Sequence, residues 1–170
     1  MRIRRIATLI MMAAAFAGVG SCGFSPLYAR PGEGAAPLAN VAVDTGDDPG
    51  RIGYLFAQAM ADKLGAYSPS GEYVLETIVS ERRRGFGIRV DDVATRYEST
   101  VTARYRLVRA SDGEVLTQGA REGVASYDVS ADPFAELSSE ERSIARAVGV
   151  VAEKVRLDLT LYFADADLPS

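Results

Sequence analysis

The chain has 170 residues, with 19 basic and 23 acidic side chains, no histidine, no tryptophan and one cysteine. These counts exclude a disulfide within the chain, zinc sites and catalytic groups built on histidine. Paired carboxylates or a serine–lysine pair would still be possible. However, Lys63 and Lys154 are the only lysines and fall on predicted helix surfaces, and no convergent acids are visible. We therefore expect no enzyme, no catalytic residue, no metal and no cofactor.

Residues 1–21 have the three-part layout of a secretory signal peptide. A basic start precedes an apolar stretch at 6–19, and the small residues Gly20 and Ser21 end the segment. The apolar stretch is shorter than the roughly 20 residues of a transmembrane helix. Removing the segment takes away three arginines and no acid, which leaves a net charge of −7. Any surface that binds a polyanion would therefore be local.

Cys22 directly follows these small residues, and the arrangement resembles a bacterial lipobox, with Val19 where leucine is commoner. In such signals the thiol is acylated and the preceding peptide is cut. Two or three acyl chains hold a protein on a bilayer, since each buried CH₂ contributes about 0.8 kcal/mol. The resemblance implies lipidation of Cys22, and Gly23 in place of aspartate favours the outer membrane. The alternative is a buried cysteine that happens to follow a cleavage site.

Residues 22–37 are interpreted as the acylated N-terminus and a tether, because 29–37 is rich in proline, glycine and alanine. Residues 38–164 have a usual length for a single α+β domain with one core. The first predicted strand is 38–44. Asp48 is expected to cap the following helix, with Pro49 at its first position.

An apolar stripe at helical spacing follows, and Gly65 can end this helix in a left-handed cap. The stripe is expected to pack on a sheet rather than to contact lipid, and it contains Ile52, Leu55, Phe56, Ala59, Met60 and Leu64.

Three strands are predicted next, at 72–81, 94–109 and 115–127. The second alternates strictly, so one face should meet a core and the other should be polar and rich in arginine. The odd positions are Tyr97, Ser99, Val101, Ala103, Tyr105 and Leu107, and the even positions are Arg96, Glu98, Thr100, Thr102, Arg104 and Arg106. Asp112-Gly113 predicts a hairpin turn. Gly119 and Gly123 indicate a bulge or bend in the third strand.

The C-terminal segment predicts a long amphipathic helix of about five to six turns. Ser138 and Glu141 have the spacing of a capping box at its start. Its apolar stripe contains Ile144, Val148, Val151, Val155, Leu159 and Tyr162. A mixed four-stranded sheet with both helices on one face buries all the stripes at once. The predicted fold class is therefore α+β, a two-layer sandwich in the order βαβββα.

With the lipobox, the start "CGFSPLY", this element order and the ending "LDLTLYF", the chain resembles the LptE family of lipopolysaccharide-assembly lipoproteins, in its alphaproteobacterial form. The resemblance implies an outer-membrane lipoprotein on the periplasmic side that plugs an LptD-type β-barrel and helps it assemble and insert lipopolysaccharide. No nucleic acid is expected as a partner. Phe24, Pro26, Leu27 and Tyr28 would then contact the barrel or the bilayer edge, although packing on the protein's own core is as good an interpretation.

The segment "ERRRGFGIRVDD" at 81–92 concentrates arginine, which pairs well with phosphate. The candidate contacts with lipopolysaccharide or the barrel are Arg82, Arg83, Arg84, Arg89, Arg104 and Arg106. The alternative is a solvated loop in a chain that prefers arginine to lysine.

Three other functions are weighed against this one. An auxiliary outer-membrane lipoprotein of an intermembrane phospholipid transporter would share the anchor and the fold. A lipid-anchored periplasmic hydrolase would need a pocket with convergent acids, and an activator of cell-wall synthesis would bind a synthase instead of a barrel.

Overall fold

The computed structural model describes residues 37–65, 71–88 and 94–166. All of them belong to one compact unit, Gly32–Ser170. The predicted signal peptide, Cys22 and most of the tether lie outside the described residues.

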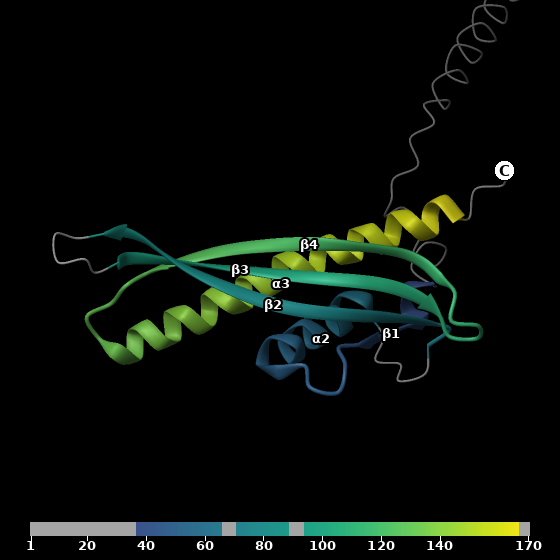
Figure 1. Ribbon diagram of the computed structural model, residues 1–170, viewed down its shortest axis with the longest axis horizontal. Coiled ribbons are helices and arrows are strands. Elements are labelled where there is room, and N and C mark those ends of the chain that lie inside the picture. The colour runs from purple at the N-terminus through teal and green to yellow at the C-terminus, as the bar shows by residue number, and fades with distance from the viewer. Residues whose placement is uncertain (1–36, 66–70, 89–93, 167–170) are drawn as a thin grey trace, which may run out of the picture. The chain divides into compact units, whose positions relative to one another are not determined.

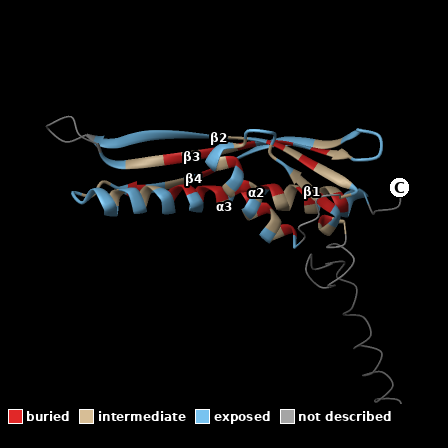
Figure 2. Cartoon of the chain, turned by 90° about the horizontal axis from the view of Figure 1, so that it is seen from below, coloured by how far each residue is buried: buried red, intermediate tan, exposed pale blue. Residues whose placement is uncertain are grey.

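The sheet and its two helices have the predicted order. A short 3₁₀ turn, η1 (Leu38–Asn40), leads into β1 (Val41–Asp44), and the chain continues through α2 (Gly50–Leu64), β2 (Tyr73–Ile88), β3 (Ala94–Arg109), β4 (Val115–Asp128) and α3 (Pro133–Ala166). The strands lie in the order β1-β2-β3-β4, with β1 parallel to β2 and the other neighbours antiparallel. Both helices cover one face of the sheet (Figures 1 and 2). The two-layer α+β sandwich with a mixed sheet is therefore confirmed.

The alternation of side chains along the strands decides which face is covered. In β3 the odd positions from Ser99 to Leu107 are buried, whereas Arg104 and Arg106 are exposed, as predicted. β2 follows the same rule, because Leu75 and Thr77 are buried and the side chain of Ile78 is 73% exposed. In β2, in β3 and in β4 from Thr117 onward, the odd-numbered side chains thus face the helices and the even-numbered ones form the opposite face.

The helix α2 begins and ends where local backbone geometry dictates. It ends at Gly65, whose φ of 70° makes the predicted left-handed cap. The predicted start is wrong by one residue, because Pro49 is itself the N-cap and no side chain among the described residues caps the helix. Gly50, with φ 58°, turns the chain there, and the first helical bond runs from the Gly53 N–H to the Pro49 carbonyl. Asp48 therefore does not cap the helix.

The helix α3 is longer than predicted, with 34 residues from Pro133 to Ala166. Its N–H donors are capped by Asp132, whose carboxylate accepts a hydrogen bond from the Phe134 N–H at 3.0 Å. Asp132-Pro133 is itself a strong start signal, so Ser138 and Glu141 lie inside the helix and the predicted capping box is wrong. The apolar stripe is confirmed, since its members from Ile144 to Leu159 are buried.

Gly119 and Gly123 are sites of close approach and not of a bulge. The β3–β4 ladder keeps its register through both, and the only shift in it lies between Leu107 and Val108. A Cβ at Gly123 would lie 2.3 Å from the carbonyl oxygen of Ala147, on the backbone of α3, and one at Gly119 would lie 2.8 Å from the hydroxyl of Tyr105. Glycine at 123 therefore lets α3 pack directly on β4.

Gly123→Ala is expected to lower the free energy of unfolding by about 1–3 kcal/mol, because the added methyl group meets helix backbone that cannot yield. The matched control is Gly149→Ala on α3, where no atom lies within 4 Å of the new Cβ. That control should gain up to about 1 kcal/mol in helix propensity. Urea unfolding of both variants measures the difference, and equal stabilities would contradict the close packing.

Candidate functional site

The uncovered side of the sheet is the candidate site, and we call it the open face. It carries the even-numbered side chains of three strands: Glu76, Ile78, Ser80, Arg82, Arg84 and Phe86 of β2, Arg96, Glu98, Thr100, Thr102, Arg104 and Arg106 of β3, and Gln118, Ala120, Glu122, Val124, Ser126 and Asp128 of β4. These residues include five arginines and four carboxylates. The open face is therefore polar as predicted, but its charges nearly balance.

Ion pairs consume part of the positive charge. Arg106 pairs with Glu76, and Arg96 pairs with Asp128 at 2.8 Å. Arg82, Arg84 and Arg104 make no ion pair with the residues that the structure describes. Their guanidinium groups are thus the ones available to an external anion.

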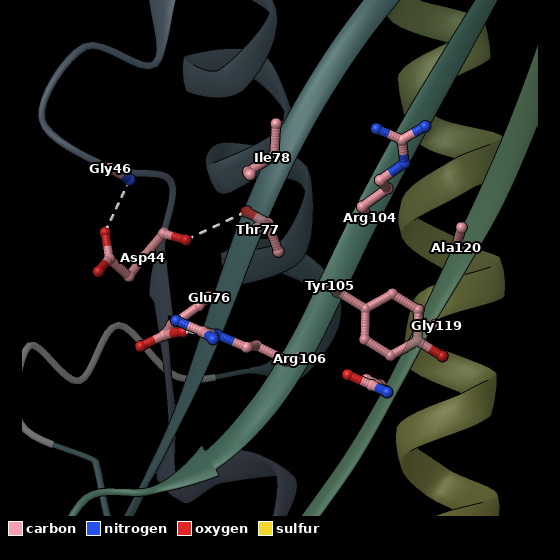
Figure 3. A pocket seen from close by; sticks show the side chains of 11 residues that line it. Asp44, Gly46, Glu76, Thr77, Ile78, Arg104, Tyr105, Arg106, Gly119 and Ala120 are labelled. Atoms are coloured by element: carbon pink, nitrogen blue, oxygen red, sulfur yellow. Dashed lines mark hydrogen bonds and ion pairs between the residues drawn. The ribbon is translucent and has the colours of Figure 1, made fainter. Parts of the chain in front are cut away.

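A broad groove of about 840 Å³ lies on the open face at the end of the sheet where β1 pairs with β2. Figure 3 shows its lining residues, which come from the end of β1 and from β2, β3 and β4. The exposed side chain of Ile78 supplies apolar surface, and Arg104 lies on the neighbouring strand. The Glu76–Arg106 pair lies further along the same two strands. The groove therefore combines an apolar patch with the guanidinium of Arg104, which has no ion pair among the described residues.

A second, more polar groove of about 460 Å³ lies toward the β2–β3 hairpin. Arg82 and Arg84 line it together with Glu98 and Glu122, and the other lining residues are Ser80, Glu81, Thr100 and Thr102. In the sheet Arg82 stands opposite Thr100, and Arg84 stands opposite Glu98. The two arginines of this groove can donate hydrogen bonds to phosphate or carboxylate oxygens.

The structure separates the three consecutive arginines that sequence reasoning grouped together. The strand was predicted to end at Glu81, but β2 continues to Ile88, so Arg82, Arg83 and Arg84 lie in a strand and not in a loop. Successive side chains of a strand point to opposite faces, so Arg83 cannot share a face with its two neighbours. Of the other predicted contacts, Arg89 and residues 24–28 lie outside the described residues.

Arg83 instead holds the start of α3 against the sheet. Its guanidinium donates to Glu140 Oε1 at 2.8 Å and lies 4.8 Å from the centre of the Tyr97 ring. A weaker hydrogen bond reaches the hydroxyl of Tyr127 at 3.4 Å. The charge of Glu140 raises the pKa of Arg83 above its usual value. Arg83 therefore contacts α3 and lies on the opposite side of β2 from Arg82 and Arg84.

A second polar cluster, around Asp158, fixes the C-terminal half of α3. Arg121 of β4 donates two hydrogen bonds of 2.7 Å to the Asp158 carboxylate, and the Tyr105 hydroxyl donates a third at 2.6 Å. Burial raises the pKa of Tyr105 well above its usual range. Burial alone would raise the pKa of Asp158, but the hydrogen bonds from Arg121 and Tyr105 outweigh it and leave that pKa lowered. Sequence reasoning missed this cluster, although the charge of Arg121 at an inward-facing position was a usable signal.

The lowered pKa of Asp158 predicts a loss of stability in acid. The contribution of the Asp158 carboxylate to the free energy of unfolding is complete above about pH 4, the usual pKa of aspartate in an unfolded chain. It is lost as the pH falls through the lower pKa of Asp158 in the folded protein. Asp158→Asn should therefore reduce stability by about 2 kcal/mol at pH 7 and flatten the dependence of stability on pH below 4. Urea midpoints between pH 2 and pH 7 measure this effect.

The control is Asp165→Asn, an exposed carboxylate on the last turn of α3 without an ion pair among the described residues. It should leave the pH profile of the parent unchanged. A profile for Asp158→Asn as steep as that of the parent would contradict the role given to this carboxylate.

Neither a metal centre nor a membrane helix is found in the part of the chain that the structure describes. No group of three or more histidine, cysteine, aspartate or glutamate side chains within residues 37–65, 71–88 and 94–166 could hold a metal ion. Within the same ranges, no helix has the length and apolar character needed to span a bilayer.

Solved structures of bacterial lipoproteins share this fold. A predicted lipoprotein from Caulobacter crescentus CB15 is 27% identical with a TM-score of 0.69, and the match covers 80% of this chain and 98% of that one. The rare lipoprotein B of Shewanella oneidensis matches with 11% identity and a TM-score of 0.58, over 75% of this chain and 98% of that one. A minor lipoprotein of Acinetobacter baumannii matches with 11% identity and a TM-score of 0.54, over 71% and 90%.

No curated protein sequence matches the chain significantly. The family model LptE, lipopolysaccharide-assembly, matches residues 38–159, from the turn before β1 through most of α3. The chain therefore belongs to the LptE family of lipopolysaccharide-assembly lipoproteins.

Proposed function

We propose that this protein is an outer-membrane lipoprotein, acylated at Cys22 and facing the periplasm, that occupies an LptD-type β-barrel and helps it assemble and deliver lipopolysaccharide to the outer leaflet. The observation that carries the proposal is the match of the lipopolysaccharide-assembly family over residues 38–159. The proposed role is one of binding and assembly, without catalysis.

The open face supports this role physically. The lumen of a large outer-membrane barrel is polar, so a protein that fills it needs a polar outer surface on a rigid fold. Here one face of the sheet is covered by helices, and the other offers five arginines and four carboxylates to its surroundings. Under the proposal residues 1–21 are removed and 22–37 tether the domain to the membrane. Phe24, Pro26, Leu27 and Tyr28 then contact the barrel or the bilayer edge.

Affinity purification of the intact acylated protein from cell envelopes tests the partner. A large outer-membrane β-barrel protein should remain bound in detergent. Cys22→Ala, which removes the acylation site, should reduce the yield of the barrel in the same purification. Recovery of no barrel would contradict the proposal, and recovery of an inner-membrane transporter complex would favour the auxiliary transport lipoprotein.

For direct binding of lipopolysaccharide, we propose Arg82, Arg84 and Arg104, the open-face arginines without an ion pair among the described residues. Arg106 contributes less, since it is already paired with Glu76. Phosphate groups of the lipid would replace the water around these guanidinium groups.

The double variant Arg82→Ala/Arg84→Ala should retain several-fold less lipopolysaccharide in a pull-down and keep the melting temperature of the parent. Arg83→Ala is the matched control, because the same residue type lies one position away on the helix-facing side and pairs with Glu140. It should lower the melting temperature and leave binding unchanged. Equal binding by the parent and the double variant would exclude Arg82 and Arg84 as contacts.

A further inference from the structure

The outer edge of β2 is only partly covered by β1. The four residues of β1 pair with Tyr73 to Glu76, and β2 continues from there to Ile88. Because the Glu72 carbonyl accepts from the Ala110 N–H, even-numbered peptide groups of β2 bond to β3 and odd-numbered groups point away from it. The outward groups of residues 79–85 have no hydrogen-bond partner among the residues that the structure describes.

The opposite edge of the sheet is partly capped by side chains of α3. On β4 the outward carbonyl of Glu122 accepts a hydrogen bond from Lys154 Nζ at 2.7 Å, and that of Ser126 accepts one from Arg146 at 3.2 Å. No described side chain caps residues 79–85 of β2 in this way. Among the described residues, side chains of α3 thus cap two outward carbonyls of β4 and none of those at residues 79–85 of β2.

The uncapped edge is also accessible. Every residue from Ser80 to Gly87 is exposed. An exposed strand edge of this length is a template for another strand, and natural proteins usually block such an edge or use it.

The charges of Arg82 and Arg84 decide which kind of strand can pair with the β2 edge. Arg82 and Arg84 stand on the open face of the edge strand, and neither makes an ion pair with a described residue. Pairing with a second copy of this edge would bring the arginines of both copies together on one face, which is unfavourable across strands. A strand with acidic residues at alternate positions would instead meet both arginines with opposite charge.

We propose that the β2 edge at residues 79–85 binds an extended acidic segment of a partner protein as an added strand. Acidic side chains of the segment lie beside Arg82 and Arg84 on the open face. The alternate side chains of the bound segment lie on the helix-facing side, beside Glu81 and the Arg83–Glu140 pair. These side chains are uncharged, because Arg83 is already paired and an acid would lie next to Glu81. This site does not depend on the proposed role in lipopolysaccharide assembly.

The test uses the full acylated chain in detergent micelles and the synthetic peptide acetyl-Val-Glu-Val-Glu-Val-Glu-Val-amide, whose acids lie on one face of a strand. Amide exchange followed by NMR should show protection at Val79, Glu81, Arg83 and Gly85 on binding, with no change at Ser80, Arg82 and Arg84, which are already bonded to β3. The same peptide, N-methylated at the alternate residues whose N–H groups face β2, cannot donate hydrogen bonds to the edge and should not bind. Equal binding of the methylated peptide, or protection elsewhere, would overturn the proposal.

Two variants separate backbone pairing from charge. Glu81→Pro removes an outward N–H without breaking the β2–β3 ladder, and it should abolish binding. Arg82→Glu/Arg84→Glu should weaken binding of the acidic peptide at least about tenfold and strengthen binding of a lysine-for-glutamate peptide. Arg104→Glu is the control, because it reverses one charge on the same face in the central strand, away from the β2 edge, and should retain binding. If the double reversal binds the acidic peptide as well as Arg104→Glu does, the proposal is wrong, even if Glu81→Pro fails to fold.

Discussion

The packing of α3 against the sheet is the constraint on which the rest of the structure depends. The helix lies directly on β4 because Gly123 has no side chain, and its buried stripe covers the inward side chains of β3. Polar contacts reinforce both halves of the helix, through Arg83 and Glu140 near its start and through the Asp158 cluster nearer its end. With α2 beside it, this helix closes one face of the sheet and leaves the other to solvent (Figure 2). The candidate site exists because the helices occupy only one face.

The two-residue period of the strands then distributes the arginines between structure and binding. Arg83 and Arg121 point toward α3 and pair with its carboxylates. Arg82, Arg84 and Arg104 point away and make no ion pair among the described residues. The charged side chains that hold the helix in place are therefore different from those available to a partner.

The sequence predicted the elements well where the periodicity was long and unbroken. β3 has the predicted bounds, and the stripes of both helices are buried or partly buried in the core, because alternation and helical spacing report directly on burial. The ends of elements were less predictable. The end of β2 was placed too early, at Glu81, because exposed and charged strand residues lack an apolar pattern. The start of α3 at Pro133 was missed because two start signals lie within a few residues of each other. The open face was foreseen, but its ion pairs depend on cross-strand register, which no local pattern contains.

The connections between the strands also affect the order in which the fold can form. β3 and β4 are joined by a turn at residues 110–113, closed by backbone hydrogen bonds between Arg109 and Glu114 and between Gly113 and Arg109. Contacts this close in the chain close small loops and cost little entropy, whereas the parallel β1–β2 pair must enclose the whole of α2. The β2–β3–β4 meander can therefore form early, with β1 and α3 docking onto it afterwards. The folding chain would then pass through a stage in which both faces of this meander are exposed to solvent.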